Sequence, residues 1–433
     1  MEITIFLALT VALMLIGVPV VFAFTLGGIV YASMAGVELS TLMPAAVRSI
    51  DSFTLLALPM FILLGALMRD ANLSTRMIEL SKALVGRFAG GLGAVTILSC
   101  AIFGAISGSA SAAITSIGAT MIPELERDGY TKGYATGLVA ASSLLSLMIP
   151  PSIPMIIFAM TARISIKDAF LSTVVPAILV IILYGIINYF WMRKYKPKKL
   201  TKSFEINDTE NKAFIWTSFK KSALALLLPI VVLGGIYGGV FTATEAAAVG
   251  CFFAILIGTL AYRTLSCGQL YKGLWESMLL AGAIVLLLFV ITIIGRVMVL
   301  DGVPQALAEV ITDFTDSKWK ALLLINLILL IMGMLVDDIS GNILSASLIM
   351  PVAISLGVDP VHFAAISVLN LSLGNLTPPV APMLYLAGMV HGKTPVYQYI
   401  KPTMVFLIFG ALPVVLAVTF IPFLSLGLVE LFR

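Results

Sequence analysis

The chain is built from long apolar stretches separated by short polar segments. Residues 3–37, 88–123 and 133–162 contain no Asp, Glu, Lys or Arg at all. Each stretch is longer than the ~20 apolar residues that a helix needs to cross a bilayer. A membrane β-strand would instead alternate apolar and polar side chains over about ten residues. The pattern therefore predicts an all-α protein that crosses a membrane several times.

Two of the apolar stretches contain nearly the same unusual phrase. It reads PPSIPM at 150–155 and PPVAPM at 378–383. Proline lacks a backbone donor and clashes with the preceding helical turn, so three prolines within five residues must interrupt a helix. The sequence therefore predicts two broken transmembrane helices, at residues 130–162 and 360–390.

Two further stretches are too long for one crossing. As a single helix, residues 88–123 would run about 54 Å, against a hydrocarbon core of ~30 Å. Their middle, GAISGSASAA, is small and polar, which favours a re-entrant hairpin that turns near residues 107–111. Residues 319–351 carry VDDISGN inside an apolar stretch and predict a second hairpin. Both tips must be buried in protein or line a wet cavity.

The other elements follow from the same pattern. Residues 3–35 read as one kinked crossing or as two short ones broken at residues 17–19. Mixed charge at helical spacing predicts amphipathic interfacial helices at 73–88 and 303–314. Ordinary crossings are expected at 52–69, 169–192, 223–236, 246–262, 277–300 and 403–424.

The two halves of the chain align at an offset of 228, which places Pro123 on Pro351, Gly129 on Gly357 and Pro150 on Pro378. Five predicted crossings separate the two hairpins, so the hairpins enter from opposite sides. The segment 193–221 carries nine basic and three acidic residues and should be cytoplasmic. We therefore predict a first inverted repeat at 1–192, a basic cytoplasmic linker at 193–221 and a second inverted repeat at 222–433, with hairpin one entering from the cytoplasm.

Composition supports this interpretation. The chain is 60% hydrophobic and 11% charged, whereas soluble domains carry ~25% charged residues. Its surroundings are therefore a lipid bilayer. The net charge of +4 is small and points to no nucleic-acid partner, and the three cysteines lack metal-ligand spacing. Residues 3–37 are also too long for the apolar core of a cleavable signal peptide.

Inverted repeats with helices broken at mid-membrane are the architecture of secondary transporters. Each break frees backbone carbonyls that can coordinate Na⁺ and helix N-termini that attract carboxylates. We therefore expect a transporter rather than an enzyme, with Na⁺ as coupling ion and no other cofactor. The residues expected to bind the coupling ion come from both tips and both breaks: Ser107, Gly108, Ser109, Pro150, Asp337, Asp338, Ser340, Gly374, Thr377 and Pro378.

Hydroxyl and amide side chains at the same places are the candidates for substrate binding: Ser109, Ser111, Ser143, Ser340, Asn342 and Asn375. Asp337 and Asp338 are the least ordinary residues, because a carboxylate inside a membrane marks a functional site by default. Either acid could ligate Na⁺ or carry a proton, and both would simply be solvated if the tip reached water. The two need not do the same job.

Four basic residues lie near the ends of predicted segments: Arg48, Arg163, Arg296 and Lys393. Their long side chains can reach the membrane interface while the stems stay in the apolar region. We interpret them as interfacial or topological charges rather than as substrate ligands.

Five stretches, taken in order, resemble a known family: GAISGSASAAITSIGATMIPELERDGY (104–130), MIPPSIPMIIFA (148–159), LDGVPQALAEVI (300–311), VDDISGNILSASLIMPVAISLGVDP (336–360) and LTPPVAPMLYLAG (376–388). Over nearly its whole length the chain resembles the large membrane subunit of tripartite ATP-independent periplasmic (TRAP) transporters. It departs from the family's usual pattern at Asp337-Asp338-Ile339-Ser340, where a single Asp is common, and at Val380-Ala381, where Val-Gly is common.

The resemblance implies an elevator-type carrier in a bacterial inner membrane, driven by a Na⁺ gradient. It also implies two partners, a small four-helix membrane subunit and a soluble periplasmic substrate-binding protein. The implied substrates are carboxylates such as C4-dicarboxylates, sialic acid or other sugar acids.

Three other functions would each account for part of the sequence pattern. A proton-coupled organic-anion carrier or ion antiporter, working without a binding protein, would use Asp337 or Asp338. An intramembrane aspartyl protease would need two carboxylates from different helices, whereas these two are adjacent. A scaffold subunit that does not itself transport would have little use for two complete inverted repeats.

Overall fold

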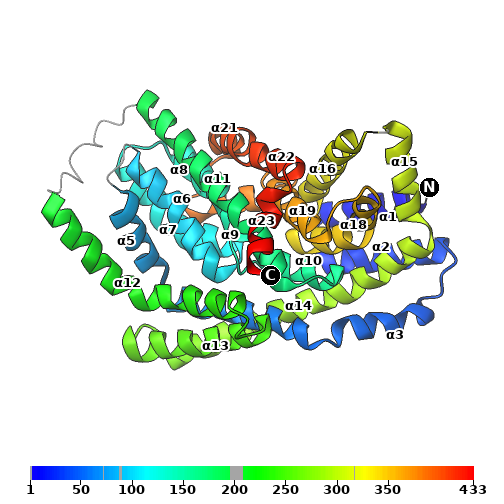
Figure 1. Ribbon diagram of the computed structural model, residues 1–433, viewed down its shortest axis with the longest axis horizontal. Helices are drawn as coiled ribbons and strands as arrows, with labels where there is room; N and C mark the ends of the chain where they lie inside the picture. Colours follow the sequence, from blue (N-terminus) through cyan, green and yellow to red (C-terminus); the bar gives the residue numbers. More distant parts are fainter. Residues whose placement is uncertain (1, 72, 87–89, 196–207, 316) are drawn as a thin grey trace.

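The computed structural model describes residues 1–433 except 1, 72, 87–89, 196–207 and 316, and within the described residues it contains helices and no strands (Figure 1). Eight of the described helices are long and apolar enough to cross a membrane. The all-α, multi-pass fold predicted from the apolar pattern is therefore confirmed.

The first apolar stretch forms two helices. α1 (Glu2–Leu15) and α2 (Val20–Met34) pack against each other, and the chain turns between them at Gly17, whose φ is +90°. α3 (Leu39–Ile50) follows. The hydropathy pattern did not predict α3, because its twelve residues include Pro44 and are too short to cross a bilayer.

The next two predicted elements are present. A short 3₁₀ turn (Phe53–Leu56) leads into α4 (Ala57–Asp70), and α5 (Leu73–Val85) is the expected amphipathic helix. Met77, Ile78 and Leu80 on its apolar face are buried. α5 packs through that face on α6 and α12.

Hairpin one consists of α6 (Gly91–Ser107) and α7 (Ala110–Arg127), which turn at residues 108–109 and pack on each other. Residues 88 and 89 of the predicted hairpin lie outside the described residues. The first broken helix is α8 (Lys132–Ser143) and the short α9 (Leu145–Met148), then the proline break, then α10 (Ile153–Ala162). α11 (Ile166–Tyr195) crosses back.

The middle of the chain is a second set of long helices. α12 (Asp208–Tyr237) and α13 (Ala243–Leu256) turn at Gly239, and a π-helical segment (Ile257–Ala261) extends α13. α14 (Cys267–Leu300) and the amphipathic α15 (Val303–Phe314) follow. Part of the predicted basic linker, residues 196–207, lies outside the described residues.

Hairpin two consists of α16 (Lys318–Leu335), a turn at residues 336–337, α17 (Asp338–Leu344), a π-helical segment (Ser345–Ile349) and α18 (Met350–Ser355). The second broken helix is α19 (Pro360–Gly374) and α20 (Pro382–Val390). The chain ends with α21 (Val396–Phe406), a π-helical segment (Leu407–Ala411), α22 (Leu412–Phe420) and α23 (Phe423–Phe432).

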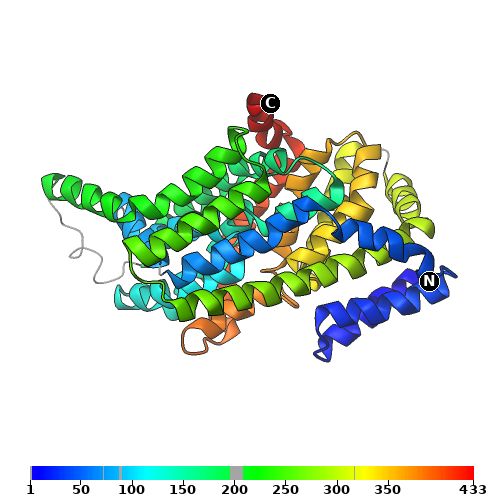
Figure 2. The ribbon, with the colours of Figure 1, turned by 90° about the horizontal axis from the view of Figure 1, so that it is seen from below.

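Most of the described helices fall into two groups, with α1, α5 and α15 packed against them. We call α2, α3, α4, α12, α13 and α14 the framework helices, because α14 contacts α2, α3 and α4, while α13 contacts both α4 and α12. Figure 2 shows α4, α12, α13 and α14 side by side along one flank. The hairpins and broken helices, with α11 and α21–α23, form the second group, which we call the central bundle.

Helix starts repeat at the offset seen in the sequence. Thr131 caps α8 by accepting from the backbone N of Tyr134, and 228 residues later Asp359 caps α19 by accepting from two backbone N atoms. Both Pro-Pro bonds, at 150–151 and 378–379, are cis. The boundaries of the two repeats and the side from which each hairpin enters stay predictions.

Candidate ion- and substrate-binding site

The tip of hairpin one is held against the first break. Gly108 has φ +58°, and a Cβ on it would come within 2.4 Å of the Pro151 carbonyl oxygen. Its own carbonyl accepts a hydrogen bond from the backbone N of Ile153 at 3.3 Å. Only glycine suits this left-handed conformation and this close approach. The tip and the break are therefore one structural unit.

Serines complete that unit. Ser109 caps α7 by accepting from the backbone N of Ala112, and Ser152 caps α10 by accepting from that of Met155. Ser146 donates to the carbonyl of Cys100 at 3.1 Å, and Gly104 lies so close that an added Cβ would be 2.4 Å from Cα of Ser146. Small and hydroxylated residues thus let hairpin one lie directly on the broken helix.

The tip of hairpin two is organised by Asp337. Its carboxylate caps α17, accepting from the backbone N of Ile339 at 3.0 Å and of Ser340 at 3.3 Å, and also from the Ser340 hydroxyl. A carboxylate at a helix N-terminus satisfies donors that have no partner within the helix. Asp337 is therefore occupied by its role as a cap.

Asp338 differs from its neighbour. Its Oδ1 is buried and accepts no hydrogen bond, although the Asn375 side chain approaches its carboxyl group. The Oδ1 atoms of Asn342 and Asn375 are likewise buried without a partner, and the Asn342 amide donates to the Asp338 carbonyl at 2.6 Å. Three adjacent side chains thus present bare oxygens, which is costly unless a cation or a proton occupies the site.

The second break carries the remaining predicted ligands. The Gly374 carbonyl accepts from the backbone N of Thr377 at 2.8 Å, and the Thr377 hydroxyl donates to the Leu373 carbonyl at 2.9 Å. Gly374 and Gly333 are in backbone contact, since a Cβ on Gly374 would lie 2.6 Å from Cα of Gly333. Hairpin two therefore lies on the second break as hairpin one lies on the first.

Each half of the chain also packs on the other. α10, which follows the first break, contacts α17 of hairpin two, and α20, which follows the second break, contacts α7 of hairpin one. The two tips and the two breaks therefore belong to one packed centre, although α17 begins 176 residues after α10 ends and α20 begins 255 residues after α7 ends.

Three of the predicted site residues line one cavity. Ser107, Ser109 and Ser111 border a space of about 320 Å³ between hairpin one and the framework helices α4 and α14. The Oγ of Ser107 is buried and unpartnered, whereas Ser109 and Ser111 bond each other at 3.0 Å. This cavity is a candidate passage for substrate.

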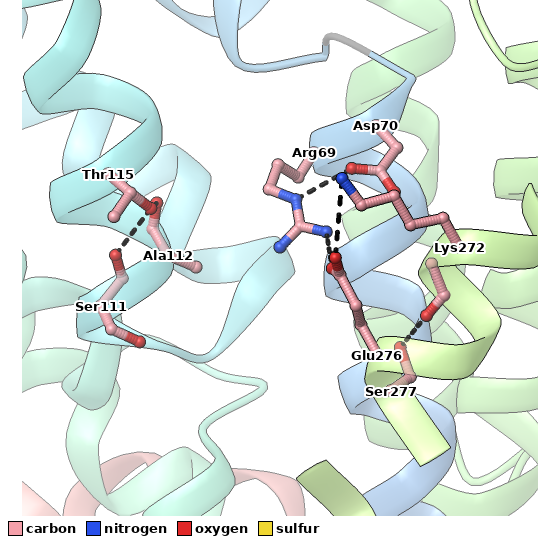
Figure 3. Close-up of polar contacts among 9 residues, drawn as sticks. Arg69, Asp70, Ser111, Ala112, Thr115, Lys272, Glu276 and Ser277 are labelled. Carbon is pink, nitrogen blue, oxygen red and sulfur yellow. Dashed lines mark hydrogen bonds and ion pairs between the residues drawn. The ribbon is translucent and has the colours of Figure 1, made fainter. Parts of the chain in front are cut away.

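The same cavity contains charges that the sequence did not single out. Arg69 of α4 bonds Asp70 at 2.9 Å and Glu276 of α14 at 2.8 Å, opposite Ser111 and Thr115 of α7 (Figure 3). Arg69 and Glu276 line the cavity. The pair is 207 residues apart in the chain, so no local sequence signal joins the two residues.

The remaining predicted site residues lie in helix packing, at a hairpin tip or at the proline breaks. Ser143 is fully buried, and its hydroxyl donates to the Ala140 carbonyl at 2.7 Å within its own helix. Ser340 is also fully buried and bonds Asp337. Pro150 and Pro378 begin the two breaks. The structure therefore brings Asp338, Asn342 and Asn375 together and leaves Ser143 in the packing of α8.

Two helical hairpins, each packed on a broken helix in a multi-pass fold, are typical of a membrane transporter. The model of the family described as "Tripartite ATP-independent periplasmic transporter, DctM component" matches residues 7–424. The chain belongs to this family, whose members are permeases rather than enzymes, and it is a multi-pass protein of the inner membrane.

Relatives cover most of the chain. It is 35% identical to the sialic acid TRAP transporter large permease protein SiaM of Vibrio cholerae, over 88% of each chain. It is 31% identical to the C4-dicarboxylate TRAP transporter large permease protein DctM of Rhodobacter capsulatus, over 100% of this chain and 99% of that one. It is also 34% identical to the isethionate TRAP transporter permease protein DctMQ of Oleidesulfovibrio alaskensis, over 94% of this chain but only 63% of that one.

Solved structures agree on the fold. The Alcanivorax borkumensis YdaH transporter, described as having an unusual topology, superposes with a TM-score of 0.64 at 15% identity, over 90% of this chain and 89% of that one. Neisseria gonorrhoeae MtrF superposes with a TM-score of 0.57 at 14% identity, over 88% of this chain and 83% of that one. At such low identity the likeness concerns the fold alone.

Proposed function

We propose that the protein is the large permease subunit of a tripartite transporter that uses a Na⁺ gradient to import an organic acid. The observation that carries the proposal is the group of unpartnered oxygens on Asp338, Asn342 and Asn375. Hard oxygen ligands beside a broken helix suit a small cation. The carboxylate of Asp338 carries one negative charge, and the amide oxygens of Asn342 and Asn375 carry none. One bound monovalent cation would therefore neutralise the site.

The substrate class rests on the relatives and on the cavity chemistry. The three relatives are named for sialic acid, a C4-dicarboxylate and isethionate, which are all organic anions. The hydroxyls of hairpin one and the guanidinium of Arg69 line the cavity between hairpin one and the framework helices. We therefore propose an organic carboxylate, such as a C4-dicarboxylate, sialic acid or another sugar acid, as the substrate.

Two partners complete the proposal: a small four-helix membrane subunit and a periplasmic substrate-binding protein. The framework helices carry large apolar side chains that this chain leaves exposed, among them Phe252, Leu260, Trp275, Met278 and Leu279 on α13, its π-helical extension and α14. A small membrane subunit and lipid would cover these side chains. The binding protein would deliver substrate from the periplasm.

Transport would proceed by an elevator movement. The central bundle holds both tips and both breaks, while the framework helices α4 and α14 form the opposite wall of the hairpin-one cavity. A displacement of the bundle along this wall would carry ion and substrate together. The packing of each hairpin on its break supports movement of the bundle as one body.

The test is thermal unfolding of the detergent-purified protein across a Na⁺ titration, with choline holding the ionic strength constant. A ligand that binds only the folded state stabilises it by RT ln(1 + [L]/Kd), about 2.7 kcal/mol at a hundredfold Kd. We expect saturable stabilisation by Na⁺ that is weakened in Asp338→Asn and Thr377→Ala. An equal response to Na⁺ and choline would contradict Na⁺ coupling.

The same observation favours one alternative. A proton on Asp338 would also satisfy a buried carboxyl group, which would make the protein a proton-coupled organic-anion carrier or antiporter working without a binding protein. Uptake into proteoliposomes separates the two functions. A Na⁺ gradient without a pH gradient drives the first, and a pH gradient without Na⁺ drives the second.

A further inference from the structure

A second cavity, of about 820 Å³, also borders α14, nearer the C-terminal end of that helix than the hairpin-one cavity. α3 and α14 of the framework and the end of α10 line it, and Ser347 of hairpin two reaches it. This cavity lies beside hairpin two, as the hairpin-one cavity lies beside hairpin one. We call it the arginine cavity.

Three arginines from three different elements line this cavity: Arg48 in the last turn of α3, Arg163 at the C-terminal cap of α10 and Arg296 in α14. Among the described residues, none of the three arginine side chains makes a hydrogen bond or ion pair, and no acidic residue lines the cavity. Their positions near segment ends suggested isolated interfacial charges, whereas the fold brings them to one cavity.

The two cavities differ in charge. In the hairpin-one cavity, Arg69 is paired with both Asp70 and Glu276. In the arginine cavity three guanidinium groups have no such partner within the part of the chain that the structure describes. A cleft lined by charges of one sign between low-dielectric walls focuses the field and raises the local concentration of oppositely charged solutes. A guanidinium also binds a carboxylate through two parallel hydrogen bonds.

We propose that the arginine cavity collects the organic anion before it reaches the hairpin tips, with Arg48, Arg163 and Arg296 as its first ligands. This inference rests on the proposed function. The predicted inversion places the hairpin-two side outside the cell, where a binding protein would release its substrate. The charge difference between the cavities then favours entry at the arginine cavity and release past the neutralised Arg69.

The first test needs no substrate. Cys267 is the exposed cysteine and Cys100 and Cys251 are buried, so reporters are introduced in a Cys267→Ser background. Ser52→Cys reports on the arginine cavity and Thr115→Cys on the hairpin-one cavity. Each cysteine is modified in separate reactions with an anionic sulfonatoethyl and a cationic trimethylammonioethyl methanethiosulfonate. The anionic rate is divided by the cationic rate at the same cysteine, which removes the effect of how accessible that cysteine is.

We expect the anionic-to-cationic rate ratio to be on the order of tenfold higher at position 52 than at position 115. It should fall severalfold in Arg296→Gln and stay unchanged in Lys320→Gln, which removes an exposed charge of α16 that does not line the cavity. Equal ratios at the two reporters would overturn the proposal. So would a ratio at position 52 that is the same in Arg296→Gln as in the unsubstituted protein.

The second test concerns the substrate. The protein is reconstituted with its small membrane subunit and binding protein, and uptake of succinate, N-acetylneuraminate and isethionate is measured. Each Arg→Gln variant should raise KM severalfold with kcat retained, and the conservative Arg→Lys variants should restore part of the loss. Uptake with unchanged KM in all three Gln variants would overturn this inference alone. Absence of uptake of every anion tested would overturn the proposed function together with it.

Discussion

Asp337 and Asp338 are adjacent in the chain, yet their carboxylates have opposite surroundings. The Asp337 carboxylate accepts from two backbone N atoms and one hydroxyl, while Oδ1 of Asp338 is buried and accepts from none. The difference arises because α17 begins between them. Asp337 is the N-cap residue, whose carboxylate accepts from the backbone N–H groups of the first helical turn, whereas Asp338 is the first helical residue and its side chain does not reach those groups. Asp337 therefore caps the helix at the tip, and Asp338 keeps an unpartnered oxygen for the ion proposed above.

Asp337→Ala should destabilise the protein by ~0.5–2 kcal/mol, the usual cost of removing a helix N-cap. The loss should be the same with and without Na⁺, because the cap lies outside the proposed ion site. Chemical unfolding in detergent measures it, and Glu430→Ala, an exposed acid on α23, is the matched control. If the loss vanished in choline, Asp337 would be an ion ligand rather than a cap.

Ser107→Ala should leave the stability unchanged or higher in Na⁺-free buffer, because it removes a buried hydroxyl that has no partner. If Ser107 is an ion ligand, the Na⁺ response should weaken at the same time. Ser146→Ala is the contrasting variant. Its hydroxyl donates to Cys100, so it should lose about 1 kcal/mol at every Na⁺ concentration. Equal behaviour of the two variants would refute the distinction.

Gly108→Ala should disrupt the contact between hairpin one and the first break. A non-glycine residue in the left-handed region costs ~1–3 kcal/mol when it is held there, and the added Cβ would overlap the Pro151 carbonyl. We expect a lower unfolding temperature and loss of transport. Gly185→Ala, where a Cβ meets nothing within 4 Å, should leave both unchanged, and a tolerated Gly108→Ala would show that the tip moves away from the break.

Glu276→Gln should have little effect on stability, within ~1 kcal/mol, because both partners of the Arg69–Glu276 pair are about two-fifths exposed. Its effect on transport should be larger. Removing one carboxylate leaves the hairpin-one cavity more positive, which should slow anion release and lower kcat with KM retained. Steady-state uptake measures this, and Lys320→Gln again serves as control. A change in KM alone would place the pair on the entry path instead.

The hairpins and breaks could be predicted because their signals are local. Apolar runs too long for one crossing, and three prolines in five residues, leave few structures possible in a membrane. The cap formed by Asp337 could not be foreseen, since VDDISGN allows a helix to start after either Asp. That choice depends on how α16 ends at Leu335 and packs on α19.

The two cavities could not be predicted from the sequence, because residues from distant elements line them. Arg48, Arg163 and Arg296 come from three elements, and one of these, α3, has too few residues to give a membrane-span signal. The Arg69–Glu276 pair likewise depends on the contact between α4 and α14. Hydropathy places each residue near the end of a segment but carries no information about which ends meet.

The contact between α7 and α20 has a consequence for biosynthesis. α20 begins at Pro382, long after α7 ends at Arg127. At ~5–20 residues per second, the ribosome needs roughly 10–50 s to make the chain between them. During that time hairpin one of the nascent chain lies in the bilayer without α20, which contacts it in the finished fold. The early contacts of α6 with α8 and α9, with Gly104 against Ser146, must hold its polar tip until the second half of the chain arrives.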